Sequence, residues 1–413
     1  MRFRKIFSIS LSAQAAVLGV GFVNSIMITR YLGVEGRGQY AIAMNVVTVL
    51  ALLLGDGLYR SNTYLVSVNR KRLSGLFSNG AVAVTGSGVL LTVLFFTWGS
   101  EIIRTALPGL NRAILFWAVL SLAPVVFLRS VEGLVLGLQR YLMFNVFVVL
   151  PLFLYLLFNV AVFLAGRYSP AFLLRNYFAA MGAVSAFAVF WMIRNARVRF
   201  RPSAHLAGES LSKGIQANLS HLCLFMLFRV DIFLINLFLG TEAAGLYSIA
   251  VLISELLQKL ANTSGTVLFP KVAGGPSGTG QTLSVRVLGF VLLAGAVFSA
   301  LLYGFGERLI VLLFKADFAP AAAPLRILLP GTVIMAGGKI VLFSLWGRGF
   351  PRITILVPLA ALILNTALNL ILIPKAGIEG AALATSVSYV LFGLALGAYF
   401  FARPDASPRN RSA

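Results

Sequence analysis

The residues of this sequence that could do chemistry are the few charged side chains that interrupt its apolar stretches. They are Asp56, Arg129, Glu132, Arg229, Asp231, Glu255, Lys259 and Lys339. One charged side chain inside a membrane costs about 2.5 to 3.5 kcal/mol on insertion scales, so it usually faces a water-filled cavity or an opposite charge. Cations in such a cavity could hold acidic groups of a ligand, and an acid could bind a proton or a sodium ion.

Four cations are candidate substrate-binding residues, namely Lys339, Arg229, Lys259 and Arg129. Lys339 is the sharpest candidate because no opposite charge lies within one helical turn of it in the sequence. It therefore needs a partner on another helix, an anionic ligand, or loss of its proton. Arg129 is a weaker candidate, because Glu132 follows it at a spacing that allows an ion pair on one helix.

Asp231 and Glu255 are candidate ion-coupling residues. Glu255 belongs to a polar stripe with a spacing of three to four residues, which includes Gln258, Lys259 and Asn262. We expect Gln258 and Asn262 to line a solvated cavity. In the alternative interpretation, Glu255 pairs with Lys259, and Arg229 pairs with Asp231 or Glu255, so that these ion pairs only pack two helices together.

The elements that must position these residues are membrane-spanning helices. The chain has 413 residues, of which 59% are hydrophobic and 11% charged, too little polar material to cover a water-soluble globule. The apolar residues form blocks of about 20, the length that crosses a hydrocarbon core of roughly 30 Å as a helix. We predict an all-α polytopic membrane protein with about twelve transmembrane helices.

The distribution of lysine and arginine predicts the orientation of these helices. With the N-terminus inside, 20 of these residues fall in inner segments and 10 in outer segments, which places both termini in the cytoplasm. The formal charge of +22 is spread over short loops. We therefore expect anionic membrane lipid, and not nucleic acid, as the partner of this charge.

An internal repeat divides the chain in two. Residues 32–43 match residues 239–250 at seven of twelve positions with an offset of 207, which Pro151 and Pro358 keep. Six spans separate the copies, so the halves are parallel repeats, with a binding site expected in a central cavity between two six-helix lobes. We predict an N-terminal lobe (1–193), a cytoplasmic linker (194–214), a C-terminal lobe (215–401) and a cytoplasmic tail (402–413).

The repeat also shows that the two halves differ in charge. The offset places Asn24 opposite Asp231, and the polar stripe occurs only in the second half. Span 6–29 would contribute Gln14 and Asn24 as neutral cavity residues. We therefore expect the binding site mainly on the faces of the second half.

Enzymatic interpretations lack the necessary residues. His205 and His221 have no metal-ligand spacing to each other or to carboxylates, and the glycine-rich segment 274–280 has no following lysine for a phosphate loop. We expect no catalytic residues, no metal site and no cofactor.

Three stretches resemble the polysaccharide transporters, or O-antigen-type flippases, of the multidrug/oligosaccharidyl-lipid/polysaccharide exporter superfamily. They are Arg30–Tyr40, Asp231–Gly240 with Gly245 and Tyr247, and Leu364–Pro374 followed by Gly377, Gly380, Ala381 and Thr385. Residues 313–327 are similar to the loop that this family has before span ten.

The resemblance implies a flippase that moves undecaprenyl-pyrophosphate-linked oligosaccharides across the bacterial inner membrane for lipopolysaccharide or related glycans. Alternating access, coupling to a proton or sodium ion, and contact with the polysaccharide synthesis machinery are further expectations. Two alternatives are a cation-coupled multidrug exporter of the same superfamily, and a membrane polymerase or glycosyltransferase. The polymerase lacks support because no outer loop is long enough to carry catalytic acids.

Overall fold

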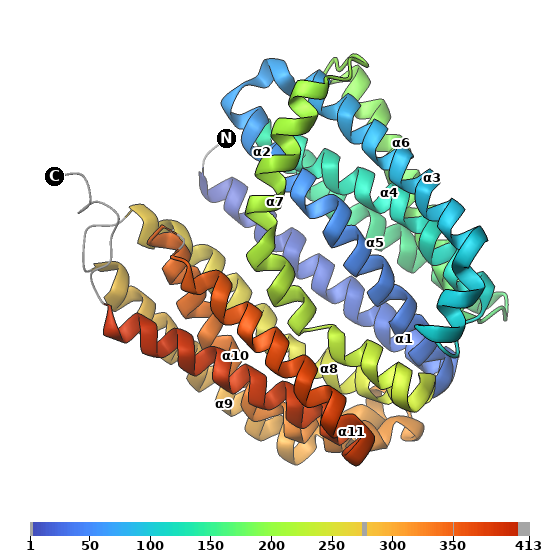
Figure 1. Ribbon diagram of the computed structural model, residues 1–413, viewed down its shortest axis with the longest axis vertical. Coiled ribbons are helices and arrows are strands. Elements are labelled where there is room, and N and C mark those ends of the chain that lie inside the picture. The colour runs from blue at the N-terminus through green and yellow to red at the C-terminus, as the bar shows by residue number, and fades with distance from the viewer. Residues whose placement is uncertain (1–2, 275–278, 350, 404–413) are drawn as a thin grey trace. The chain divides into compact units, whose positions relative to one another are not determined.

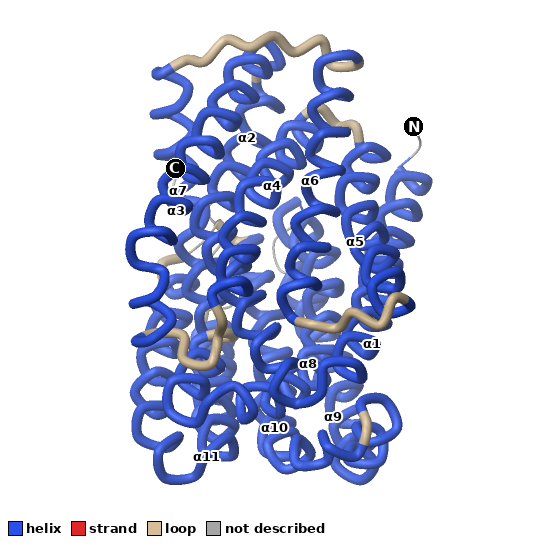
Figure 2. The backbone as a smooth tube through the Cα atoms, turned by 90° about the vertical axis from the view of Figure 1, so that its right-hand side faces the viewer, coloured by secondary structure: helices blue, strands red, loops and turns tan. Residues whose placement is uncertain are grey.

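The computed structural model describes residues 3–274, 279–349 and 351–403, and all regular elements of these residues are helices (Figures 1 and 2). The helices are α1 (Phe3–Ala51), η1 (Leu52–Asp56), α2 (Gly57–Val68), η2 (Arg70–Arg72), α3 (Leu73–Thr105), α4 (Arg112–Gly137), α5 (Tyr141–Leu164), α6 (Pro170–Arg194), α7 (Ala204–Leu227), α8 (Val230–Gly274), α9 (Thr279–Phe314), η3 (Ala316–Ala321), α10 (Ala322–Gly347) and α11 (Ile353–Ala402). Residues 404–413 of the predicted tail and residues 275–278 of the glycine-rich segment lie outside the described residues.

Nine stretches of the described chain are long and apolar enough to cross a membrane, and three of them contain a kink. A straight helix of 50 residues would extend about 75 Å, more than twice the thickness of the hydrocarbon core. Each kinked stretch therefore makes two crossings, and Figure 1 shows the chain turning back at these points in α1, α8 and α11. The nine stretches thus supply twelve crossings, which confirms the predicted all-helical, polytopic fold.

The first two kinks occur at equivalent positions of the repeat. Gly33 in α1 has φ 68° and ψ −172°, and Gly240 in α8 has φ 85° and ψ −178°. A positive φ is unfavourable for residues with a Cβ atom, so glycine is required where the chain makes this turn. The repeated motif is therefore the sequence of the turn that joins the first two crossings of each half.

The chain forms two compact units, Met1–Leu222 and Cys223–Ala413. In the first unit, α4 packs against α2, α3 and α6; in the second, α10 packs against α8, α9 and α11. These two helices are the most buried crossings in the described chain. Each of the two helices has one charged side chain that is buried in this way, Glu132 on α4 and Lys339 on α10.

The segment between α6 and α7 is fixed to the first unit by hydrogen bonds. The backbone N–H groups of Arg199, Arg201 and Ser203 donate to the side chains of Ser74, Ser78 and Asn79 on α3, at 3.2, 2.7 and 2.8 Å. The first turns of α7 continue this packing, since Ser210 lies 2.7 Å from Ser61 of α2. The start of α7 is thus part of the first unit.

Candidate functional site

A break in the seventh crossing lies beside the candidate substrate-binding residues of the second unit. Helix α7 ends at Leu227, and α8 begins at Val230. Phe228 and Arg229 form a turn between the two helices, with N–H groups that donate to the carbonyl oxygens of Phe225 and Met226 at 3.1 and 3.0 Å. Discontinuous membrane helices are common where a transporter binds its substrate.

Lys339 lies on α10 next to this break. Its side chain is 5% exposed, and its Nζ atom lies 4.4 Å from the centre of the Phe228 ring. Within the described residues, no carboxylate oxygen lies within 4 Å of this amine. The partner that Lys339 has in the structure is therefore an aromatic face, an arrangement that stabilises a cation without neutralising it.

Arg229 and Glu255 form a two-point ion pair close to Lys339. The Nη1 and Nη2 atoms of Arg229 donate to the two carboxylate oxygens of Glu255 at 2.7 and 3.2 Å, and both side chains are half-buried. Lys259, one turn further along α8, is exposed. Arg229, Glu255 and Lys259 all lie near enough to interact electrostatically with Lys339.

This arrangement decides between the pairings that the sequence left open. Glu255 pairs with Arg229 and not with Lys259, and Arg229 does not pair with Asp231. Three cations, Lys339, Arg229 and Lys259, thus share one carboxylate, an excess of two formal positive charges. An anion that entered this region would meet a bidentate guanidinium, a buried amine and an exposed amine.

Asp231 belongs to a separate cluster of hydroxyl groups in the same unit. Its carboxylate is 2% exposed and accepts hydrogen bonds from the Tyr247 hydroxyl at 2.6 Å, from Thr385 at 3.2 Å and from the N–H of Ile232 at 2.8 Å. Within the described part of the chain, no basic side chain lies within 4 Å of it. The burial of this acid is thus compensated by neutral donors.

Two asparagines of α11 extend the cluster. Asn365 donates to the Thr385 hydroxyl at 3.2 Å, and Asn369 donates to the Asn365 side-chain oxygen at 3.0 Å. Both are fully buried, and the Oδ1 atom of Asn369 has no hydrogen-bond partner among the described residues. Carboxylate, amide and hydroxyl oxygens are the ligands that small hard cations prefer.

The sequence interpretation missed these partners of Asp231. Tyr247, Asn365, Asn369 and Thr385 lie in the second and third of the stretches that carry the family resemblance. One signal could have found them: Asn365 and Asn369 lie four residues apart in an otherwise apolar span, and buried amides in a membrane need partners.

The first unit has a polar cluster at the corresponding position, but it contains no acid. Asn159 donates to Asn24 at 3.0 Å, Asn176 donates to Asn159 at 3.0 Å, and the Tyr155 hydroxyl donates to Tyr40 at 3.0 Å. All five side chains are buried. Asn24 and Tyr40 are the repeat equivalents of Asp231 and Tyr247, so both halves have a buried polar cluster at these positions, with an acid only in the second half.

The remaining predicted site residues do not belong to the cation group around Lys339 or to the cluster around Asp231. Arg129 pairs with Glu132 on α4 at 3.1 Å, the arrangement of the simpler alternative. Gln258 is buried and donates to the carbonyl oxygen of Thr332 at 3.0 Å, whereas Asn262 is half-buried and Gln14 is exposed. Gln258 therefore faces α10.

A second charged group of the first unit surrounds the π-helical turn η1. Asp56, the last residue of η1, lies 3.9 Å from Arg60 and 3.4 Å from the Nδ1 atom of His221. Single π-helical turns often occur at functional sites. Across the described residues, no group of three or more histidine, cysteine, aspartate or glutamate side chains could hold a metal ion.

Solved structures with a similar fold are membrane transporters. An inward-facing multidrug resistance MATE family transporter of the MOP superfamily matches with a TM-score of 0.79 and 14% identity, over 95% of this chain and 96% of that one. The lipid II flippase MurJ in an inward closed conformation matches with a TM-score of 0.78 and 13% identity, over 96% and 87%. At these identities the likeness shows the fold.

Curated relatives match shorter stretches of the sequence. The uncharacterized membrane protein MJ1375 of Methanocaldococcus jannaschii is 27% identical over 172 residues, 40% of each chain. The "Probable low-salt glycan biosynthesis flippase Agl15" of Haloferax volcanii is 26% identical over 167 residues. The matches cover 39–40% of this chain but only 35–40% of these relatives' length.

A family match covers more of the chain and agrees with the resemblance of the three motif stretches. The polysaccharide biosynthesis protein family matches residues 3–273, well over half of the 413 residues. The chain therefore belongs to the polysaccharide biosynthesis protein family.

Proposed function

We propose that this protein is a flippase that translocates lipid-linked oligosaccharides, with their pyrophosphate group bound by the cations around Lys339. The observation that carries this proposal is a buried amine with an aromatic partner and no carboxylate within 4 Å, next to the Arg229–Glu255 pair. A pyrophosphate would supply the negative charge that this group of cations lacks.

The cluster around Asp231 is the proposed ion-coupling site. A buried acid with neutral partners gains stability when it binds a proton or a sodium ion. The unpaired Oδ1 atom of Asn369 adds an oxygen that could face a sodium ion. Glu255 has a different role in this proposal: it fixes the Arg229 guanidinium, so ion coupling rests on Asp231.

The finer details of the proposal rest on the distribution of lysine and arginine between inner and outer segments and on the resemblance to the polysaccharide transporters. They are an undecaprenyl pyrophosphate carrier, a glycan of the O-antigen or lipopolysaccharide type, and an inner-membrane location with both termini in the cytoplasm. Alternating access would occur about a central cavity between lobes 1–193 and 215–401, linked by 194–214. Asn24, Gln14, Gln258, Asn262 and Arg129 are proposed as its lesser polar residues. The protein would act as a transporter and not as an enzyme.

Translocation in proteoliposomes tests the proposal directly. A fluorescent pyrophosphate-linked oligosaccharide on a polyprenyl carrier is placed in both leaflets, and the fraction protected from a membrane-impermeant quencher is measured over time. We expect translocation by the wild type that accelerates with an imposed sodium or proton gradient. The proposal would be contradicted if the protein translocated none of this lipid under either gradient, although a thermal unfolding measurement showed that the protein was folded.

A second candidate function is cation-coupled multidrug export, which the buried carboxylate Asp231 also favours. It predicts that overexpression raises resistance to cationic dyes and that the same proteoliposomes extrude them. The excess of cations around Lys339 favours an anionic substrate instead, because cationic drugs would be repelled there. Unchanged dye susceptibility on overexpression would remove this candidate.

A further inference from the structure

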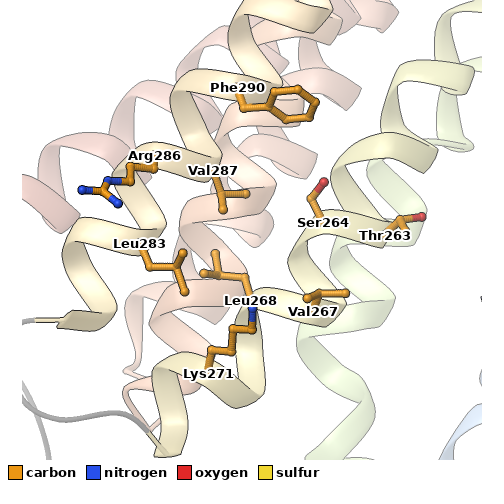
Figure 3. Close-up of a pocket in the computed structure, with 9 residues that line it drawn as sticks. All are labelled: Thr263, Ser264, Val267, Leu268, Lys271, Leu283, Arg286, Val287 and Phe290. Atoms are coloured by element: carbon orange, nitrogen blue, oxygen red, sulfur yellow. The ribbon is translucent and has the colours of Figure 1, made fainter. Parts of the chain in front are cut away.

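We propose that a groove between α8 and α9 binds one anionic phospholipid, with the phosphate at Lys271, Arg286 on the α9 rim as a second cation for the headgroup, and an acyl chain along the groove. This inference does not depend on the transported substrate. The groove lies within the second unit and encloses about 420 Å³ (Figure 3), a volume in the range of small-molecule sites.

The wall of the groove is apolar over a length suited to one acyl chain. Leu283, Val287 and Phe290 form the α9 side, and Val267 and Leu268 form the α8 side. Leu268 is almost fully buried, whereas Phe290 is 59% exposed. Leu283 and Phe290 are seven residues apart, which corresponds to about 10 Å along the helix, most of the ~15 Å hydrocarbon depth of one leaflet.

Of the two cations of the groove, Lys271 lies at the end near the α8–α9 connection, and Arg286 lies further along α9, between Leu283 and Phe290. Figure 3 shows the Lys271 amine directed toward Leu268, whereas the Arg286 guanidinium extends from α9 away from α8. Both side chains are exposed, and neither is within 4 Å of a carboxylate in the described residues. The sequence has no acidic residue between Glu255 and Glu307, so neither helix neutralises these cations at this end.

The combination of apolar wall and unneutralised cations favours a lipid phosphate over a soluble anion. A soluble anion would contact the cations but leave the wall uncovered, while a neutral lipid would cover the wall without meeting the charge. Long basic side chains at helix ends reach the headgroup region, where basic pockets between helices bind anionic headgroups. The flippase's own polyprenyl carrier is a different occupant, and its tail is far longer than the groove.

Native mass spectrometry of the full-length protein in detergent tests the assignment. We expect the wild type to retain one phosphatidylglycerol in preference to phosphatidylcholine. The double variant Lys271→Gln, Arg286→Gln should bind phosphatidylglycerol about thirtyfold more weakly, since each basic residue near an anionic surface contributes about 1 kcal/mol. Ser264→Leu, which narrows the deep end of the groove, should weaken binding while keeping both charges.

A matched control removes the same charges elsewhere in the unit. Arg308→Gln with Lys375→Gln takes one arginine and one lysine from exposed positions outside the groove, and should leave phosphatidylglycerol binding unchanged. Equal affinity in both double variants would overturn the site. Displacement of phosphatidylglycerol by an equimolar amount of undecaprenyl phosphate would overturn the phospholipid assignment in favour of the carrier.

Discussion

The two units place similar polar clusters at equivalent positions, but they treat charge differently. The first unit surrounds Asn24 with Asn159 and Asn176, so each amide has a neutral partner. The second unit surrounds Asp231 with Tyr247 and Thr385, so a carboxylate is buried among hydroxyl groups. Equivalent positions of the repeat thus hold a network of neutral amides in one half and a buried acid in the other.

The most buried helices of the two units, α4 and α10, also differ in how their buried charge is paired. On α4 the buried Glu132 has Arg129 as a partner at 3.1 Å, while on α10 the buried Lys339 lies against Phe228. A paired charge mainly stabilises helix packing, whereas a buried charge with no opposite charge beside it is costly and usually serves a ligand. This difference in pairing between Glu132 and Lys339 indicates that a ligand-binding site is to be expected in the second unit.

The largest expected effect is the loss of transport in Lys339→Ala. Removing a charge-assisted contact to the pyrophosphate should lower translocation about a hundredfold, because such a contact contributes about 3 kcal/mol. Thermal unfolding should show a fold at least as stable as the wild type, since a costly buried cation is removed. The matched variant in the first unit, Glu132→Gln, should retain most translocation; equal losses in both would erase the contrast between α4 and α10.

The second largest effect is expected for variants that exchange the acid and the amide between the Asp231 cluster and the Asn24 cluster. Asp231→Asn gives the second unit the residue of the first, and should abolish the response of translocation to an ion gradient, a loss of about tenfold under a full gradient. The reverse variant, Asn24→Asp, should lower the free energy of unfolding by about 2.5 to 3.5 kcal/mol. A gradient response that survives in Asp231→Asn would show that coupling lies elsewhere.

A smaller effect compares the two tyrosines. Tyr247→Phe removes a donor to a carboxylate and should destabilise the second unit by about 3 kcal/mol, whereas Tyr40→Phe removes a partner of a neutral hydroxyl and should cost about 1 kcal/mol. Chemical denaturation in detergent measures both values. Equal costs would mean that Asp231 is protonated in the folded protein.

The smallest contrast concerns the turns, where the halves should behave alike. An added Cβ at Gly33 or Gly240 would meet no described atom within 4 Å, so only the positive φ is unfavourable. Gly33→Ala and Gly240→Ala should each cost about 1 to 2 kcal/mol, as measured by thermal unfolding. A much larger cost at one position would show that the two turns are not structurally equivalent.

The sequence predicts the fold well because the features that determine the fold are local. Apolar blocks give the crossings, and the match between residues 32–43 and 239–250 marks the Gly33 and Gly240 turns. The break at Phe228–Arg229 was not predictable in this way, since neither glycine nor proline lies there.

The candidate site was only partly predictable, because its partners come from distant segments. The sequence singles out Asp231 and Lys339 as costly, but Thr385 and Phe228 are 154 and 111 residues away from them. Helical spacing also placed Gln258 on a polar stripe without revealing that α10 covers it. Periodicity identifies a face of a helix, while packing decides what that face meets.

The hydrogen bonds between α3 and the segment after α6 bear on how the chain assembles during synthesis. Domains generally fold as units, with the N-terminal one first. In a nascent chain that ends at residue 193, the side chains of Ser74, Ser78 and Asn79 would lack the backbone N–H groups from which they accept hydrogen bonds in the finished protein. The first half therefore completes its own packing only after the start of α7 has emerged from the ribosome. A fragment that ends at 222 should be inserted and resist proteolysis better than one that ends at 193.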